Sequence, residues 1–550
     1  MFERQNRGLH VVLGLAFFVV VWALPAPSTA EPARVGEPYQ LEGNRLVFTN
    51  WIYVRPGDVE WVDSEGNSVN ADESVSMGPF EAVWAPVDHM PWGIQLKAHK
   101  PEGYREWKIE PEYPWEAGGS ISIRTILNEN GVYKAWGSCQ AGNCYFESED
   151  CTNWRRPKLG LIEFEGSTAN NLIPHMPIGD VFVDPTSEDE RYKSIWVEGG
   201  EMPIEELEAF KKKYPDDWGP RVLRWIDGKP HVTRVLGAVS PDGFHWKTLP
   251  EPVLMEHCDT HNIGYYDPKL KKYVAYVRTW NALERAPSLP VEENRWDYWL
   301  PNARRSIARA ESDDFRHFPR SELLLEATPY LAPTDGLYTN CFTWIPGAPE
   351  HLMMFPAIRH LHDDTTTIAM LSSPNGKNWH WVPGGEKLIE TGPYGRWDGG
   401  CVWAIPPLME LADGSFAIRI SGHNFPHKYP RGQREIGEKI AVWPHGRIAS
   451  IEAAEKGEFG TVAVVPKGTK LYLNARTLRT GYIRVAAQYG VRYGDIIPGR
   501  EFENAIPIVG DQPRAPVQWK DADDLGIELG EPVILLFKME QAEIFSLEFK

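Results

Sequence analysis

The sequence is poor in positive charge. Lysine and arginine number 57 against 76 aspartate and glutamate residues, which gives a formal net charge of −19. A field of that sign repels nucleic acid and anionic membrane surfaces, so neither is an expected partner. An acidic substrate such as a sulfated glycan would need a local basic pocket. The chain also lacks a phosphate-cradling Gly-rich loop and a Gly-x-Ser-x-Gly elbow, which disfavours nucleotide enzymes and α/β-hydrolases.

Long apolar runs are scarce, and the one at the N-terminus is short. Residues 11–24 are apolar, follow Arg4 and Arg7, and precede the small residues 28–30. These are the three parts of a cleavable secretory signal over residues 1–30. The run is shorter than the roughly 20 residues of a membrane span, which makes an uncleaved anchor the alternative. We expect a secreted or periplasmic protein with no membrane span after signal cleavage.

Cysteine is also scarce. The six residues are Cys139, Cys144, Cys151, Cys258, Cys341 and Cys401. In an oxidising compartment, we expect at least one disulfide among the first three, which lie close together in sequence. The absence of a second close pair disfavours a zinc site made of cysteines alone. Cys341 and Cys401 lie in apolar stretches and are expected to be buried free thiols.

Turn-forming residues and aromatics are abundant, with 48 Gly, 46 Pro and 23 Trp. This composition argues against a helical bundle. A short pattern of Ser-x-Asp/Asn, a turn residue and then an aromatic recurs four times. The four copies end at Trp154, Trp246, Phe318 and Trp379. The pattern predicts a hairpin turn, in which Asp or Asn caps its own turn, Gly takes a positive φ and the aromatic starts the next strand.

Pairs of apolar strands lie between these copies. Their ranges are 181–183 with 191–196, 263–267 with 273–277, 342–346 with 352–355, and 402–405 with 415–420. Repeated units of about four strands are typical of a β-propeller. Counting residues 80–150 as one unit gives about five blades. Two insertions interrupt the pattern: a short helix predicted over 203–214 and a Trp- and Pro-rich loop over 281–302, of a length that is often functional.

After Gly446 the tryptophans thin out and strands alternate between turns, which predicts a β-sandwich over residues 447–550. Residues 80–446 are assigned to the propeller and 31–79 to an N-terminal extension with strands. The expected fold class is therefore all-β: a five-bladed β-propeller followed by a C-terminal β-sandwich.

The order of these motifs resembles the five-bladed glycoside hydrolases of families 32, 43 and 68, and more closely their uncharacterised secreted relatives of planctomycete type. The resemblance lies in residues 147–160 with 170–171, 184–193, 259–262 and 397–399. The chain lacks the Trp-x-Asn-Asp-Pro-Asn-Gly, Arg-Asp-Pro and Glu-Cys motifs of family 32, so no catalytic residue carries over directly. Sialidases have Ser-x-Asp-x-Gly-x-x-Trp, whereas Gly directly follows Asp here.

Glycoside hydrolysis usually needs one carboxylic acid and a second carboxylate as base or nucleophile. The resemblance implies that both come from the start of each blade's innermost strand, around the propeller axis. The carboxylates at those positions are Asp259 and Asp398, which are the strongest candidates, followed by Asp180 and Asp335. The alternative role for each aspartate is to cap the turn at the start of its strand.

Further polar and aromatic residues near those strands are predicted to bind substrate. They are Glu116, His261, Asn262, Arg278, Trp280 and Trp397. Arg278 would clamp a carboxylate or a sugar hydroxyl, or form a salt bridge between blades. Two histidine clusters, 257–261 and 360–364, are expected to hydrogen-bond loops. No metal or cofactor is therefore expected, a structural Ca²⁺ being the alternative.

These observations predict a secreted glycoside hydrolase that acts on a poly- or oligosaccharide through paired carboxylates at the propeller axis. The alternative is a non-catalytic carbohydrate-binding or surface-assembly propeller. The enzyme requires at least two of the carboxylates to face one central cavity. The sequence leaves the sugar, the linkage and the oligomeric state open.

Overall fold

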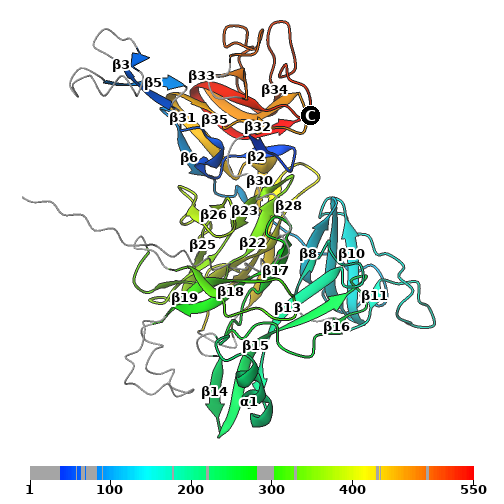
Figure 1. The fold of residues 1–550 in the computed structure, drawn as a ribbon. Helices are drawn as coiled ribbons and strands as arrows, with labels where there is room; N and C mark the ends of the chain where they lie inside the picture. The colour runs from blue at the N-terminus through cyan, green and yellow to red at the C-terminus, as the bar shows by residue number, and fades with distance from the viewer. Residues whose placement is uncertain are drawn as a thin grey trace, which may run out of the picture. The chain divides into compact units, whose positions relative to one another are not determined.

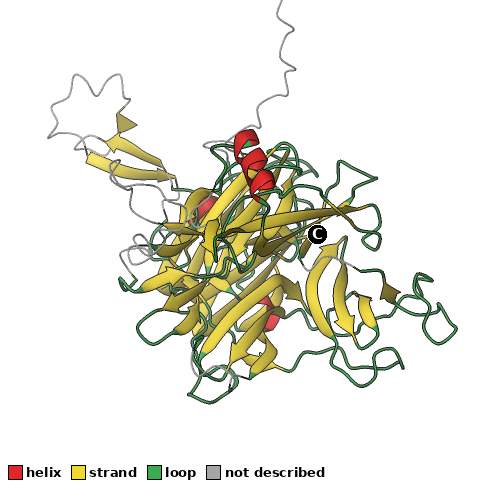
Figure 2. Ribbon diagram, turned by 90° about the horizontal axis from the view of Figure 1, so that it is seen from below, coloured by secondary structure: helices red, strands yellow, loops and turns green. Residues whose placement is uncertain are grey.

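The computed structural model describes residues 38–56, 58–62, 68–69, 83–88, 91–175, 179–218, 222–281, 303–326, 331–428, 433, 435–490 and 495–550. The predicted signal and most of the loop over 281–302 lie outside the described residues. Strands dominate these ranges (Figure 2), which contain one α-helix, α1 (Ile204–Lys213), where a helix was predicted. Two 3₁₀ helices are η1 (Trp51–Tyr53) and η4 (Pro444–Gly446). Among the described helices, none has the length and apolarity that crossing a membrane requires.

Five antiparallel sheets, here called sheets I to V, follow one another along the chain (Figure 1). Sheet I contains β8 (Ser122–Glu129), β9 (Val132–Cys139), β10 (Gly142–Ser148) and β11 (Leu172–Ile173). Sheet II contains β12 (Asp180–Val183), β13 (Tyr192–Glu201), β14 (Leu223–Ile226), β15 (Lys229–Ser240) and β16 (Lys247–Thr248). Sheet III contains β17 (Ile263–Asp267), β18 (Lys272–Asn281), β19 (Arg304–Ser312) and β20 (Glu322–Leu325).

Sheets IV and V complete the series. Sheet IV contains β22 (Phe342–Ile345), β23 (Ala348–Met354), β26 (Leu371–Ser373) and β27 (His380–Trp381). A three-stranded sheet of β21 (Asp335–Leu337), β24 (Ala357–His360) and β25 (Thr365–Ile368) is inserted around it. Sheet V contains β28 (Cys401–Glu410), β29 (Phe416–His423) and β30 (Ile436–Trp443), and β7 (Gly103–Arg105) pairs with β30 as its fourth strand.

Five apolar clusters each draw their side chains from two consecutive sheets. Their members include Trp136 with Val181 (I and II), Val235 with Ala275 (II and III), Tyr265 with Phe342 (III and IV), Met353 with Val402 (IV and V), and Met409 with Phe146 (V and I). Because sheet V also packs on sheet I, each of the five sheets packs on two others, and we call this cyclic order of contacts the ring. Their first strands, β8, β12, β17, β22 and β28, lie on the inside of that ring, and neighbouring first strands contact one another.

The C-terminal residues form an eight-stranded sheet with strands from both ends of the chain. Its strands are β31 (Ala449–Gly460), β32 (Val464–Val465), β33 (Leu471–Tyr489), β34 (Asp511–Pro516), β35 (Val533–Phe549), β1 (Tyr39–Gln40), β2 (Arg45–Val47) and β6 (Gln95–Ala98). The residues assigned to an N-terminal extension thus share a sheet with the C-terminal region. The two longest strands, β33 and β35, run through one hydrogen-bonded sheet, so the β-sandwich stays a prediction.

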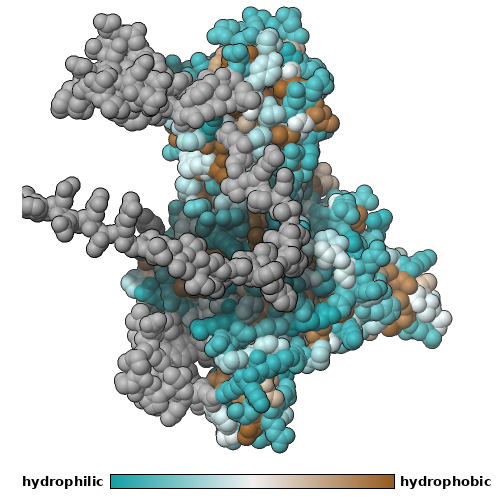
Figure 3. Space-filling model, in the orientation of Figure 1, coloured by the Kyte–Doolittle hydropathy of each residue, from teal (hydrophilic) through white to brown (hydrophobic). Residues whose placement is uncertain are grey.

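A separate small sheet contains β3 (Asp58–Val62), β4 (Ser68–Val69) and β5 (Val83–Asp88). On the face that Figure 3 shows, the described residues are mostly hydrophilic, and the apolar ones lie in small separate groups. Single exposed aromatics such as Trp92 and Tyr394 fit this pattern. Most apolar side chains lie in the cores between and within the sheets.

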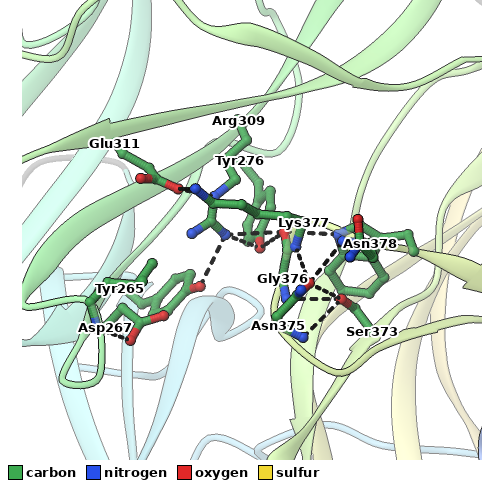
Figure 4. A network of polar contacts seen from close by, with 12 residues as sticks. Tyr265, Asp267, Tyr276, Arg309, Glu311, Ser373, Asn375, Gly376, Lys377 and Asn378 are labelled. Carbon is green, nitrogen blue, oxygen red and sulfur yellow. Dashed lines mark hydrogen bonds and ion pairs between the residues drawn. The ribbon is translucent and has the colours of Figure 1, made fainter. Parts of the chain in front are cut away.

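The repeated turn is confirmed, and its best example lies in sheet IV (Figure 4). Ser373 Oγ accepts the backbone N–H of Gly376 at 2.8 Å, and Asn375 Oδ1 accepts that of Asn378 at 2.8 Å. The Gly376 carbonyl accepts the Tyr276 hydroxyl at 2.8 Å and Arg309 Nη1 at 3.1 Å, both from sheet III. The turn therefore links sheet IV to sheet III through hydrogen bonds.

The same position of the other turns also contacts the element before it. In sheet II, the Gly243 carbonyl accepts Trp136 Nε1 of sheet I at 2.8 Å. In sheet I, the Cys151 carbonyl accepts Trp107 Nε1 at 2.8 Å. In sheet III, the Phe315 ring packs edge-on against Phe182 of sheet II, with ring centroids 5.7 Å apart. In sheets II, III and IV, the repeat thus makes contacts with the preceding sheet as well as turns.

The cysteines differ from the prediction, because all six are free thiols. Cys151 occupies the glycine position of its turn, with φ of 56°. Its backbone carbonyl accepts the hydrogen bond from Trp107 Nε1. Cys139 and Cys144 lie on the paired strands β9 and β10, and their thiols form a hydrogen bond. That bond lowers the pKa of Cys139 to about 7. Cys341 and Cys401 are buried thiols, as predicted.

Replacing Gly376 with Ala tests the inter-sheet turn. At φ of 72°, a Cβ atom would lie 2.6 Å from the Tyr276 hydroxyl oxygen and 2.7 Å from Arg309 Nη1. We expect a loss of about 1–2 kcal/mol from the left-handed backbone and about 1–3 kcal/mol more from overpacking, measured by denaturant unfolding. The control is Gly414→Ala, since Gly414 has φ of 74° and nothing within 4 Å of its Cβ position. Equal losses in both variants would contradict the docking role.

Alkylation tests the thiol pair. Cys139 is the least buried cysteine and has the lowered pKa, so iodoacetamide at pH 7.5 should modify it before the other five. Cys144→Ala removes the hydrogen-bonding thiol and should slow that reaction. Peptide mass spectrometry over time measures both. Recovery of a Cys139–Cys144 disulfide from the native protein would instead support the bond expected from the sequence.

Candidate active site

A cavity of about 810 Å³ opens where the first strands of the ring begin. Its size is in the range of small-ligand sites. Residues from sheets I, II, III and V line it: Arg124, Thr125, His175, Gly179, Asp180, Ile195, Trp196, Val197, Glu198, Leu236, Trp246, Thr248, Asp259, Thr260, His261, Asn262, Ile263, Ile405 and Pro406. We call it the axial cavity. Of the four predicted catalytic aspartates, it contains Asp180 and Asp259.

A second cavity, of about 670 Å³, lies further along the same first strands and includes residues of all five. The two cavities share Asp180, Ile263 and Pro406. Asp180 is therefore placed where they meet, at the first position of β12.

Asp180 is partly buried, and its burial favours the neutral form. Burial raises the pKa of Asp180 to about 7, although a hydrogen bond from Thr125 Oγ1 at 3.3 Å and backbone N–H groups favour the charged form. A carboxyl group of this kind is half protonated near neutral pH, which suits a general acid.

Asp259 has a different environment. Its side chain is 58% exposed and forms an ion pair with Arg278, whose side chain is only 2% exposed. Arg278 is on β18, so the ion pair lies within the region of sheet III. The sequence offered a salt bridge between blades as one role for Arg278, but its partner here belongs to the same sheet region and is a carboxylate of the cavity itself.

His261 and Asn262 lie beside Asp259 on the cavity wall. His261 has φ of 34°, and its carbonyl accepts Asn340 Nδ2 at 2.9 Å. Burial, reinforced by the Arg419 charge, lowers the pKa of His261 to about 4, so its ring is neutral at pH 7. Asn262 Oδ1 accepts the Cys258 thiol at 2.7 Å, which leaves the Asn262 amide nitrogen for other partners.

The other two predicted catalytic aspartates lie elsewhere. Asp398, one of the two strongest candidates from the sequence, is fully buried and forms an ion pair with Arg396, with Nη2 to Oδ2 at 2.6 Å. Asp335 is buried, accepts His360 Nδ1 at 2.9 Å and lines two other cavities. Both carboxylates have protein partners, and neither lines the axial cavity.

Three predicted substrate-binding residues have structural contacts instead. Glu116 is fully buried against Arg156 and accepts the Glu112 backbone N–H at 2.8 Å. Trp397 packs edge-on against Tyr104, with ring centroids 5.0 Å apart. Trp280 is 5% exposed, and the Arg305 guanidinium lies 4.6 Å from its ring centroid. None of them presents a ring or carboxylate to the axial cavity.

Sequence reasoning missed several residues that line the cavity. Trp196 and Glu198 lie on β13 in alternate positions, and Trp246 is the aromatic of the repeated turn in sheet II. The alternation along 191–198 was a usable signal for the first two. Within the part of the chain that the structure describes, no cluster of His, Cys, Asp and Glu is arranged to hold a metal ion.

Comparisons with known proteins give weak resemblances. No protein-family model matches the sequence, and no curated protein matches it. A Bombyx mori GH32 β-fructofuranosidase is 11% identical over 87% of this chain and 96% of its own, with a TM-score of 0.33. An endo-arabinase from Bacteroides thetaiotaomicron is 11% identical over 62% and 97%, with a TM-score of 0.32. An N-acetylgalactosamine deacetylase from F. plautii is 12% identical over 63% and 96%, with a TM-score of 0.33. At these values, none of them assigns an activity to this chain.

The raised pKa of Asp180 predicts a pH-dependent effect of Asp180→Asn on stability. The folded state binds this proton more tightly than the unfolded state, whose Asp pKa is about 4, so ionisation costs stability as the pH rises from about 4 to 7. The Asn variant cannot ionise. Its melting temperature relative to the wild type should therefore be higher at pH 8 than at pH 5. Asp313→Asn, at a side chain 82% exposed, is the control. A difference from wild type that is the same at both pH values would contradict the shift.

Proposed function

We propose that sheets I to V are the blades of a five-bladed β-propeller and that the chain is a glycoside hydrolase with its active site in the axial cavity. One observation carries this proposal. Asp180 and Asp259, from the starts of neighbouring blades, line one cavity in two different electrostatic environments. Two carboxyl groups held in different environments are the usual means of separating the acid from the base in glycoside hydrolysis.

In this mechanism, Asp180 is the acid. Its carboxyl group, with a pKa of about 7, would donate a proton to the glycosidic oxygen as the bond to the leaving group breaks. Asp259 would act either on a water molecule as base or on the anomeric carbon as nucleophile. The Arg278 guanidinium holds its carboxylate in place.

The remaining lining residues would position the sugar. The Asn262 amide can hydrogen-bond hydroxyl groups, and the partly buried Trp196 and Trp246 offer ring faces. Asp398 and Asp335 have no chemical step in this proposal, because Arg396 and His360 already engage them. We further propose that the chain is exported, on the strength of the N-terminal signal pattern; N-terminal sequencing of protein from the culture medium tests this.

The test is hydrolysis of a panel of poly- and oligosaccharides by the purified protein. On any substrate found, Asp180→Asn and Asp259→Asn should each lower kcat/KM by about 100-fold or more, since each removes one proton-transfer or nucleophilic group. Asp313→Asn should leave it unchanged. The wild type should lose activity above pH 7, because Asp180 then ionises and can no longer donate a proton. The residual activity of Asp180→Asn should not show this loss.

Three results would count against the proposal. Near-normal turnover in both variants would exclude these carboxylates. Loss of activity in Asp398→Asn with an unchanged melting temperature would restore Asp398 as a catalytic candidate. Binding of a glycan without any hydrolysis would favour the alternative of a carbohydrate-binding propeller.

A further inference from the structure

Three arginine side chains gather around one tyrosine ring beside the axial cavity. Arg278, Arg305 and Arg359 come from β18, β19 and β24, and their guanidinium carbons lie 5.3, 5.1 and 5.9 Å from the ring centroid of Tyr338. The group adjoins the axial cavity twice, through the Arg278–Asp259 ion pair and through Thr260, whose hydroxyl donates to the Tyr338 carbonyl at 3.3 Å.

The positive charge of this cluster is only partly neutralised. Arg278 pairs with Asp259 and Arg359 with Asp364, but among the described residues Arg305 has no ion pair. Burial and the charges of Arg359 and Arg278 lower the pKa of Arg305 to about 10. Three guanidinium groups in such proximity repel one another, and an anion placed between them would relieve that repulsion.

Several donors in the cluster are also unused. Arg278 Nε, Arg305 Nε and Arg359 Nη1 are buried and have no hydrogen-bond acceptor in the described ranges. Arg278 is 2% exposed and Arg359 3%. A buried charged donor without an acceptor is costly, and guanidinium groups match the oxygens of a carboxylate or sulfate.

A cavity of about 640 Å³ reaches two of the three arginines. Arg305 and Arg359 line it, together with Asn281, Thr334, Asp335 and Glu326 among other residues. Its volume is within the range of small-ligand sites, and its polar walls suit a hydroxylated ligand. The carboxylates of Asp335 and Glu326 are engaged by His360 and Asn281.

We infer that Arg278, Arg305 and Arg359 bind the anionic group, a carboxylate or a sulfate ester, of an acidic sugar. Because the site adjoins Asp259, the substrate of the proposed hydrolase would then be an acidic glycan, with its charged unit held next to the unit being cleaved. That assignment of substrate class rests on the proposed function, whereas binding of the anionic sugar does not. In a chain of net charge −19, the cluster supplies the local basic pocket that such a substrate requires.

Isothermal titration with glucuronate, glucose 6-sulfate, glucose and inorganic sulfate tests the site. One or both acidic sugars should bind, at least about tenfold more tightly than glucose and than inorganic sulfate, with an affinity that falls as salt is added. The preference between glucuronate and glucose 6-sulfate identifies the anionic group.

Arg305→Gln is the decisive variant. Arg305 forms no ion pair among the described residues, so its replacement leaves no carboxylate without a partner, unlike replacement of Arg278 or Arg359. Arg305→Gln should weaken acidic-sugar binding at least about tenfold, whereas Arg305→Lys, which keeps the charge but not the planar donors, should fall between. The control is Arg316→Gln on an exposed turn of the same sheet, which should bind like the wild type. Melting temperatures of all variants check the fold.

Two results would overturn the inference: equal binding of glucose and the acidic sugars, or unchanged acidic-sugar affinity in Arg305→Gln. The proposed function fails separately. Acidic-sugar binding that Arg305→Gln abolishes, together with no hydrolysis of any glycan, keeps the anion site and refutes the hydrolase. Hydrolysis of a glycan, together with unchanged acidic-sugar affinity in Arg305→Gln, keeps the hydrolase and refutes the anion site.

Discussion

The ring of five sheets depends on a backbone carbonyl presented at a fixed place in a repeated turn. In sheets II and IV, that carbonyl belongs to a glycine whose positive φ lets it face the neighbouring sheet, where Trp136 or Tyr276 donates to it. The apolar clusters between sheets supply most of the burial, but they are non-directional. In sheets II and IV, the hydrogen bond to the turn adds a directional contact with the sheet before it.

The surroundings of the cavity also show how similar aspartates come to differ in charge state and exposure. Asp180, Asp259 and Asp398 all stand at or just before the start of a first strand, and they differ in what surrounds them. Arg396, two residues before Asp398, neutralises it inside the protein, while Arg278 holds Asp259 at a surface open to solvent. Asp180 has no cationic partner among the described residues, so burial dominates its titration. The fold brings these carboxylates to the starts of the first strands. Their immediate neighbours then decide whether each one is neutralised, held as an ion or buried without a cation.

Local chemistry made much of the architecture predictable. The serine and the Asp or Asn of each turn, with a glycine in two of the four, act within seven residues, and the alternation of apolar residues marks strands directly. The contacts that decide the site span much longer distances in sequence. The sequence around Arg278 does not indicate that Arg305 and Arg359 pack with it around Tyr338. The sequence around Asp398 likewise does not indicate that this residue lies away from the axial cavity. The disulfide expectation differs from the structure, in which Cys139 and Cys144 lie on paired strands as hydrogen-bonded thiols.

The pairing of β7 with β30 has a consequence for how the protein is made. Gly103 to Arg105 meet Ile440 to Val442, so sheet V is assembled from segments more than three hundred residues apart. Sheets I to IV can form in order as the chain is synthesised, but the ring stays open until residue 442 has emerged. The strands β1, β2 and β6 remain unpaired for longer still, because their partners β31, β32 and β35 are synthesised last. Contacts so distant in sequence slow folding and leave apolar inter-sheet faces uncovered meanwhile. Biosynthesis of this chain therefore includes a long interval in which the face of sheet I that packs on sheet V in the complete fold stays uncovered.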